Sequence, residues 1–332
     1  MNSCKSVEES WRIGFGGAKR KPPVPTKVIE FHGFQPLSAE SRAFASRKWC
    51  PFVDDKCKKS QSGGACVLQA PNANPVIICP NRLYGNEFDV IWRIARQTFG
   101  DDCELHTDLE AEAKRRNGTL DGREVVVFGQ GYSGEVGIKA PSAEGESGSF
   151  KVDFLLTSVG PDLEPLAIVA VEVQTIDTTN SYKKASIDYY AEQPHPSKWG
   201  EGGTNAGFNW ENVTKRILPQ IIYKGHALRR EKLALHGLFF VLPEPVLQKI
   251  RTRIGSSLLE YPKGPGTVTF HSYQLAESWS GGERPIELVT EFTTTVEQIA
   301  FAFVSPQNLP PLGIYENTIA AKLAALSRKT AL

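Results

Sequence analysis

The sequence has no long apolar run. No stretch approaches the ~18 consecutive apolar residues that a membrane-spanning helix needs. The first ten residues, MNSCKSVEES, carry Lys5, Glu8 and Glu9 where a signal peptide would have its apolar region. Apolar residues make up 40% of the chain and charged residues 23%, which is ordinary for a soluble globular protein. We therefore expect a cytoplasmic protein.

Two common catalytic signatures are also missing. The six histidines show no H-x-H or H-E-x-x-H spacing, which argues against a hydrolase whose metal is held by histidines. No G-x-x-x-x-G-K-[ST] sequence occurs, so an ATP-driven motor is not expected. The segment GFGG at 14–17 is too short and wrongly placed to form a phosphate loop.

The chain has little net charge, but the charge is unevenly distributed. The formal net charge is +1. Residues 1–85 hold thirteen Lys and Arg against six Asp and Glu, a local charge of +7, and residues 86–332 carry −6. Such asymmetry suggests that the N-terminal part meets an anion. A basic tail with no partner, rich in Lys, Gly and Pro around residues 14–26, remains the alternative.

The hydrophobic pattern predicts an α/β protein with a mixed central sheet flanked by helices. Strands are expected at 123–128, 166–174 and 237–242, and a strand pair at 134–139 and 150–157. Helices are expected from Asn86 as N-cap to Gly100, at 108–116, at 315–327, and over 212–235 with an interruption at Pro219. Beyond residue 242, the only element predicted is the C-terminal helix.

Three polar side chains stand out on two of the expected strands. Asp153 lies in the strand FKVDFLL, and Glu172 and Gln174 lie near the end of VAVEVQ. Because strand side chains alternate, Glu172 and Gln174 should point to the same face. An ionised Glu in an apolar strand is costly unless it is paired or binds a cation. Two carboxylates at adjacent strand ends suit Mg²⁺, and such a site could hydrolyse phosphodiesters.

A fourth acid, Glu135, lies eighteen residues before Asp153 in the expected partner strand. If the two strands form a hairpin, Glu135 can approach the same site. The alternative is that all of these acids merely occupy solvent-exposed strand ends.

Four of the six cysteines are clustered in sequence. They follow the pattern C-x₆-C-x₈-C-x₁₂-C, as Cys50, Cys57, Cys66 and Cys79, in a turn-rich stretch. Disulfides are not expected in the cytosol, and four thiolates suit zinc or iron. The spacing is not that of a C-x₂-C finger, so four unrelated buried thiols are the alternative. Cys4 and Cys103 lie outside the cluster.

An Asp-bearing strand followed by an apolar strand that ends in Glu-x-Lys resembles the signature of the PD-(D/E)xK nucleases. Here Gln174 replaces the lysine. Glutamine cannot supply a positive charge or act as a base. The resemblance therefore implies that Gln174 orients the attacking water, and that a bound metal ion lowers the pKa of that water.

The cysteine stretch and the nuclease motif together resemble the NotI-type restriction endonucleases, over roughly residues 45–242. The resemblance implies residues 1–85 as a basic region with a four-cysteine metal module, and 86–332 as a nuclease core with DNA-contacting insertions. It implies one Fe, or Zn, on Cys50, Cys57, Cys66 and Cys79, and Mg²⁺ on Asp153 and Glu172. The resemblance also implies that Glu135 is a further acid of the site, in addition to the role of Gln174.

The same resemblance implies a prokaryotic enzyme that cuts double-stranded DNA as a homodimer, with a cognate DNA methyltransferase encoded separately. Basic residues expected to contact DNA are Lys56, Lys58, Lys59, Lys198, Lys215 and Arg216. Two alternatives stay open. One is a repair or structure-selective nuclease of the same superfamily. The other is a non-catalytic, metal-stabilised DNA-binding protein. This alternative stays open because Gln174 stands where the motif has a lysine.

Overall fold

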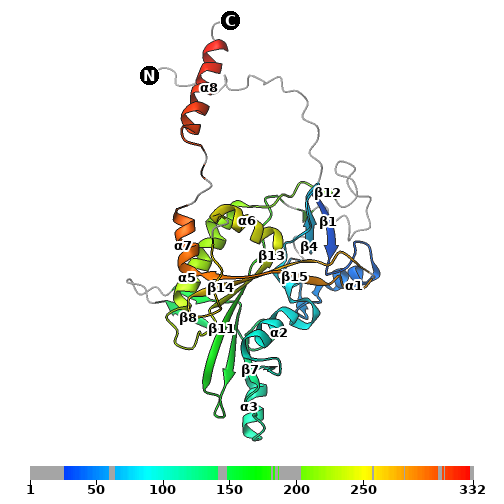
Figure 1. Ribbon diagram of the computed structural model, residues 1–332. Helices are drawn as coiled ribbons and strands as arrows, with labels where there is room; N and C mark the ends of the chain where they lie inside the picture. The colour runs from blue at the N-terminus through cyan, green and yellow to red at the C-terminus, as the bar shows by residue number, and fades with distance from the viewer. Residues whose placement is uncertain are drawn as a thin grey trace, which may run out of the picture.

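A seven-stranded mixed sheet forms the centre of the molecule (Figure 1), and helices flank it as the sequence predicted. The computed structural model describes residues 26–59, 64–140, 148–180, 182–183, 186, 203–255, 258–279, 281–305, 309 and 311–329. In spatial order the strands are β15 (Ile286–Thr295), β14 (Thr267–Leu275), β13 (Leu238–Pro243), β11 (Pro165–Val173), β10 (Phe154–Val159), β7 (Glu124–Gly129) and β6 (Glu104–His106).

The sheet combines an antiparallel part with a parallel part. β7, β10 and β11 are consecutive antiparallel neighbours. β13 then returns parallel to β11, and β14 lies parallel to β13, while β15 closes that edge as an antiparallel strand. Parallel neighbours need a crossover, and the helices between β11 and β13 provide it.

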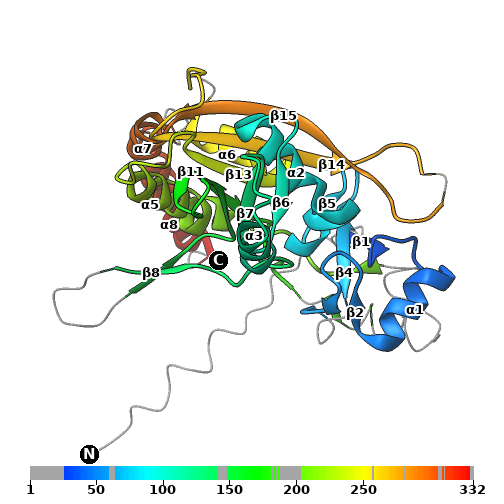
Figure 2. The same ribbon diagram turned by 90° about the horizontal axis from the view of Figure 1, so that it is seen from below.

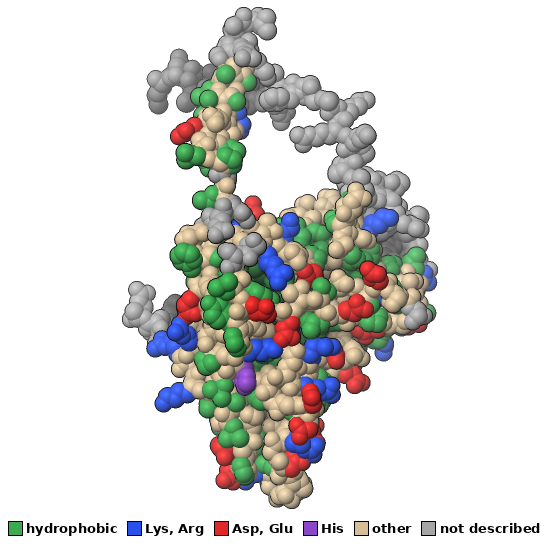
Figure 3. All heavy atoms as spheres, in the orientation of Figure 1, with side chains coloured by type: hydrophobic (Ala, Val, Ile, Leu, Met, Phe, Trp, Pro, Cys, Tyr) green, Lys and Arg blue, Asp and Glu red, His purple; other side chains and the backbone are tan. Residues whose placement is uncertain are grey.

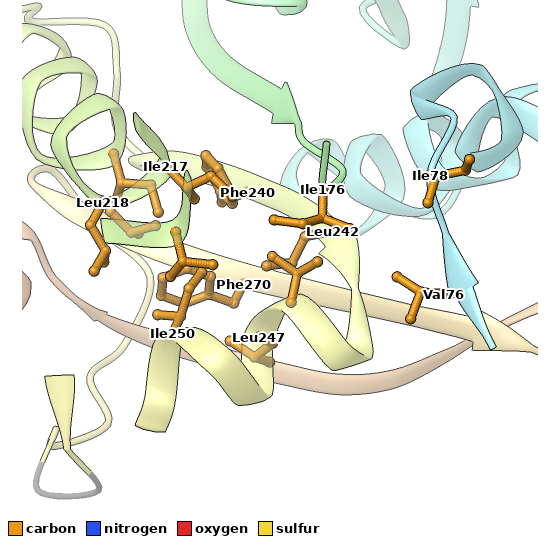
Figure 4. Close-up of a cluster of buried hydrophobic side chains, with 14 of the residues drawn as sticks. Val76, Ile78, Ile176, Ile217, Leu218, Phe240, Leu242, Leu247, Ile250 and Phe270 are labelled. Carbon is orange, nitrogen blue, oxygen red and sulfur yellow. The ribbon is translucent and has the colours of Figure 1, made fainter. Parts of the chain in front are cut away.

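The apolar strand β13 separates two hydrophobic cores. Phe240 and Leu242 face a core built with helices α5 (Leu218–Leu228), α6 (Glu244–Ile254) and α7 (Val296–Val304), part of which is drawn in Figure 4. Phe239 and Val241 face the other core, to which α2 (Gly85–Phe99) contributes. All four side chains are fully buried. Strand alternation thus lets one apolar run serve both faces of the sheet.

A smaller sheet is built mainly from the N-terminal region. Its order is β12 (Gly203–Thr204), β1 (Thr26–Phe31), β4 (Ala65–Gln69) and β5 (Val76–Ile77). Around it lie α1 (Ala39–Arg47), the short pair β2 (Trp49–Cys50) and β3 (Asp55–Lys56), and the 3₁₀ turn η2 (Pro80–Tyr84). Residues of β1 and β4 share a core with β13 and α6, so this sheet packs directly on the central one.

Several predicted elements are confirmed, and one predicted strand is divided in two. α3 (Asp108–Arg116) has the predicted bounds, and a Thr107–Glu110 capping box begins it. The predicted strand pair is present as a short antiparallel hairpin of β8 (Gly137–Ala140) and β9 (Gly148–Lys151), which projects from the body in Figure 2. The strand that follows, β10, belongs to the central sheet. The expected loop between the hairpin strands falls mostly outside the described residues.

Two helix boundaries differ from the prediction. Asn86 is not an N-cap, because Asn86, Glu87 and Phe88 all have left-handed φ values of 54–62° and regular helix begins only after them. Pro219 does not break a helix. It lies in the first turn of α5, where a missing N–H costs little, directly after the π-helical segment η3 (Val213–Ile217).

The C-terminal helix α8 (Ile314–Lys329) is present as predicted. It projects from the body in Figure 1, and Ile319, Leu323 and Leu326 are more than half exposed. Figure 3 shows apolar side chains along it. Among the described helices, none combines the length and the apolar character that a bilayer crossing requires.

Candidate active site

The sheet brings Asp153 and Glu172 together. Asp153 immediately precedes β10, and Glu172 is the penultimate residue of β11. Phe154 pairs with Val171, so one further step of the antiparallel register places Asp153 opposite Glu172. The backbone N–H of Val173 donates a 2.7 Å hydrogen bond to Asp153 Oδ2. Directly opposed side chains share a face of the sheet, so the two carboxylates converge.

Both carboxyl groups are held in an environment that disfavours charge. Burial, followed by the nearby Asp153, raises the pKa of Glu172 to about 7, against the opposing effect of Lys224. Burial also raises the pKa of Asp153, although the Val173 hydrogen bond and Lys224 act the other way. Two like charges in a poorly hydrated site resist joint ionisation, and a cation is what would relieve them.

One oxygen of Glu172 lacks a hydrogen bond within the part of the chain that the structure describes. Glu172 is only 6% exposed, and its Oε2 is buried without a hydrogen bond among the described residues. Its other oxygen, Oε1, forms an ion pair with Lys224 Nζ. Buried carboxylate oxygens are normally satisfied. An unsatisfied one beside a second carboxylate has the donor chemistry that Mg²⁺ prefers.

Glu135 lies near this pair but outside the paired strand. It precedes β8 by two residues, is exposed, and forms a 3.4 Å ion pair with Lys151. Gly137 pairs with Lys151, and two further steps of that register reach Glu135 and Asp153. The charge of Glu135 accordingly raises the pKa of Asp153. The predicted hairpin therefore brings Glu135 towards Asp153.

Gln174 follows the last residue of β11. Its backbone N–H donates to Val241 O at 2.9 Å, which extends the pairing with β13 by one residue. Its side-chain Nε2 donates to the carbonyl oxygen of Thr175 at 2.9 Å. The amide nitrogen is therefore engaged, and the side-chain oxygen is the atom that could accept a hydrogen bond from a water molecule.

Two residues of this site were missed by sequence reasoning. Lys224 of α5 reaches Glu172. Tyr84, at the end of η2, has its pKa raised by burial and then by the nearby charges of Asp153 and Glu172. A signal for Lys224 existed. It lies one helical turn from Ile221 and Leu228, which are both buried, so it borders the apolar stripe of its helix. No comparable signal marked Tyr84.

The four clustered cysteines are all buried, and none of them forms a disulfide within the described residues. The Cys66 thiol donates to the carbonyl oxygen of Gly64 at 3.8 Å. Cys66 and Cys79 lie close enough that each shifts the pKa of the other, and Cys79 and Cys57 both contribute to the raised pKa of Cys50, after burial. The Cys66 contact, together with Lys59 and two backbone N–H groups, lowers the pKa of Cys79 to about 6. Over the described ranges, however, no three His, Cys, Asp or Glu side chains are arranged so that they could hold one metal ion. Cys4 lies outside the described residues, and Cys103 is buried elsewhere, just before β6.

The cysteine cluster is joined to the carboxylate site through one backbone oxygen. The carbonyl oxygen of Ile78, next to Cys79, accepts from Lys59 Nζ at 2.6 Å and from Thr175 Oγ1 at 3.2 Å. Thr175 follows Gln174 directly. The end of the Glu-bearing strand is therefore tied to the segment that carries the cysteines.

The predicted DNA-contacting residues have different surroundings. Lys56 and Lys58 are exposed, and Lys58 donates to Gln130 at 3.3 Å. Burial raises the pKa of Asp153, and the charge of Lys58 weakly opposes that rise. Lys59 is half-buried, and its Nζ donates a hydrogen bond to the carbonyl oxygen of Ile78. Lys215 and Arg216 are exposed but paired with Glu211 and Asp177. Lys198 lies outside the described residues. On the face drawn in Figure 3, basic and acidic side chains are interspersed.

The sequence matches no protein-family model, and no curated protein is significantly similar to it.

The raised pKa of Glu172 predicts how stability depends on pH. In the folded state this pKa is about 7 against an ordinary value of 4.5, so the folded protein binds more protons between these values. Stability should fall as pH rises through that window, by up to about 3 kcal/mol. Urea unfolding in EDTA at pH 5 and pH 8 should show this loss in wild type, and a smaller loss in Glu172→Gln. Equal losses in both proteins would contradict the assignment.

Proposed function

We propose that this chain is a Mg²⁺-dependent DNA endonuclease of the PD-(D/E)xK type, resembling the NotI-type restriction endonucleases. The observation that carries the proposal is the convergence of Asp153 and Glu172 at adjacent ends of β10 and β11, with one buried oxygen of Glu172 unpaired within the described structure. The Asp-bearing strand pairs directly with the apolar Glu-bearing strand, as the motif requires.

Asp153 and Glu172 would hold the metal ion. Two carboxylates with no third protein ligand suit Mg²⁺, which commonly keeps several waters and also binds phosphate oxygens. When bound, Mg²⁺ would polarise the phosphate and lower the pKa of a water molecule. Glu135 lies at the exposed side of the pair and would assist, and the side-chain oxygen of Gln174 would orient the attacking water.

The hydrolysis exchanges one bond for another. The water oxygen forms a new bond to phosphorus, and the bond from phosphorus to the leaving sugar oxygen breaks. The proton lost by the water is balanced by the proton that the leaving oxygen takes from solvent. Cutting both strands of a palindromic site requires two such sites related by a two-fold axis, so a homodimer on double-stranded DNA belongs to the proposal.

Incubation with a long defined DNA and Mg²⁺ tests the function directly. A site-specific enzyme should give discrete fragments, and sequencing their ends would identify the recognition sequence. A repair or structure-selective nuclease should instead cut only at branched or damaged DNA. DNA binding with no cleavage at any Mg²⁺ concentration would favour the non-catalytic alternative.

The proposed cysteine site gives a separate prediction. Four buried neighbouring thiols, one with a lowered pKa, have the chemistry that binds Fe or Zn. Freshly purified protein should contain about one Fe or Zn per chain. Cys57→Ser should lose the metal and unfold at lower temperature, because metal binding is coupled to folding. Cys103→Ser is the matched control, a buried thiol outside the cluster, and should keep the metal. Elemental analysis without any transition metal in wild type would refute the site.

A further inference from the structure

The candidate site contains a lysine, although not at the position where the motif has one. Gln174 occupies that position and cannot supply a positive charge. Lys224 Nζ, which comes from α5, forms an ion pair with Glu172 Oε1. The side chains of Lys224 and Glu172 are 14% and 7% exposed. Burial raises the pKa of Asp153 and the charge of Lys224 opposes that rise, so Lys224 acts on both carboxylates.

The packing of α5 fixes Lys224 in this place. Leu218, Ile221 and Leu228 bury one side of the helix. Gly225 lies against Val296 so closely that a Cβ atom there would be 2.3 Å from a Val296 methyl. The helix can therefore approach α7 only because residue 225 has no side chain. Lys224, the preceding residue, is carried to the strand end that bears Glu172.

Burial makes this arrangement more than an incidental surface pair. Taking an ammonium group out of water costs free energy. A buried ion pair therefore does not by itself indicate that the pair stabilises the fold. Lys58 also acts on Asp153, but its side chain is exposed and donates to Gln130. Of these two lysines, only Lys224 contacts a proposed metal ligand directly.

We propose that Lys224 is a further catalytic residue, which supplies from a helix the positive charge that the motif lysine supplies from the strand. This inference rests on the proposed function. Lys224 would face the attacking water and the non-bridging phosphate oxygens, where negative charge develops as the bond to water forms and the bond to the leaving oxygen breaks. It keeps its proton throughout and acts by charge alone.

Four variants test the proposal, with single-turnover cleavage of plasmid DNA as the first measurement. Lys224→Met should slow cleavage by about 10²- to 10³-fold, the usual loss for one electrostatic stabiliser. Lys224→Arg should cleave at least about tenfold faster than Lys224→Met, because arginine keeps the positive charge. Gln174→Lys in the Lys224→Met background should also recover cleavage, because it returns the charge to the strand.

Lys114→Met is the matched control. Lys114 is a helix lysine, 23% exposed, paired at 2.8 Å with the buried Glu124. Glu124 begins β7, whereas Gly129 at its other end pairs with Phe154, so this pair lies at the far end of the strand from Asp153. Lys114→Met should match Lys224→Met in lost stability yet cleave like wild type. If Lys224→Met does not fold, Lys224→Gln replaces it.

Mn²⁺ binding, measured by electron paramagnetic resonance without DNA, gives an independent readout. Removing the Lys224 charge should tighten Mn²⁺ binding severalfold, since ammonium and metal compete for Glu172. Unchanged Mn²⁺ affinity, cleavage within about threefold of wild type, or a loss that neither Lys224→Arg nor Gln174→Lys recovers would each overturn the proposal. Failure of the proposed function is distinct: wild type itself would then cleave no DNA.

Discussion

Replacing Asp153 with alanine is expected to slow Mg²⁺-dependent DNA cleavage by at least about a thousandfold. The change removes one of two proposed metal ligands, and metal catalysis contributes several kcal/mol, at 1.36 kcal/mol for each factor of ten. DNA binding in the absence of Mg²⁺ should persist or become tighter, because a carboxylate that repels phosphate is gone. Single-turnover cleavage and a gel-shift titration measure the two effects.

The control for this prediction lies at the other end of the β10–β11 strand pair. Asp162 is exposed in the turn between β10 and β11, where its backbone N–H donates to Glu164. Asp162→Ala should cleave and bind DNA like wild type. Full cleavage by Asp153→Ala would remove the carboxylate pair from the active site. Equal loss of cleavage and of binding would indicate that Asp153 only supports the fold.

Replacing Arg82 with methionine is expected to cost about 3 to 5 kcal/mol of unfolding free energy, the range for breaking a buried ion pair. Arg82 has no exposed surface and binds Glu30 of β1 at 2.6 Å. It also contacts Glu283 and the carbonyl oxygen of Arg284, between β14 and β15. Without Arg82, Glu30 remains buried without its charged partner. Urea unfolding at pH 7 measures the loss.

Two further variants test whether the loss comes from leaving a buried charge unpaired. Glu30→Leu combined with Arg82→Met should recover part of the stability, because an apolar pair leaves no buried charge unpaired. Arg93→Met is the exposed counterpart, since Arg93 pairs with Asp89 at 3.4 Å and both are over 40% exposed. It should cost no more than about 1 kcal/mol. A loss below about 1 kcal/mol in Arg82→Met would show that the buried network contributes little.

The carboxylate pair could be anticipated because it depends on short-range pattern. An apolar run that ends in Glu172, preceded by a strand with Asp153 at its start, forms an antiparallel pair through the short turn at 160–164. That Asp153 and Glu172 lie next to each other on one face then follows from the alternation of strand side chains. Lys224 could not be placed in the same way. Its contact depends on how α5 docks, which Gly225 and Val296 decide across more than seventy residues of sequence.

The strand β14, which the sequence did not predict, shows why a central strand can be missed. β14 is almost wholly buried, yet it contains Thr269, His271 and Ser272. These polar residues hide the apolar signature of a central strand, and their partners come from distant elements. Thr269 bonds Thr293 of β15, and Ser272 bonds Glu244 of α6. A polar residue looks exposed in sequence until its partner is known.

The shared carbonyl oxygen of Ile78 constrains where this chain can change in length. The turn at Pro71–Asn74 is exposed and joins β4 to β5, so added residues there would extend into solvent. An insertion or deletion between Ile78 and Tyr84, or next to Thr175, would have a different effect. It would move one partner of the Thr175–Ile78 hydrogen bond away from the other. Related sequences should therefore vary in length freely at 71–74 and keep a fixed spacing from Ile78 to Tyr84. Variation in that spacing would have to be matched at the end of β11.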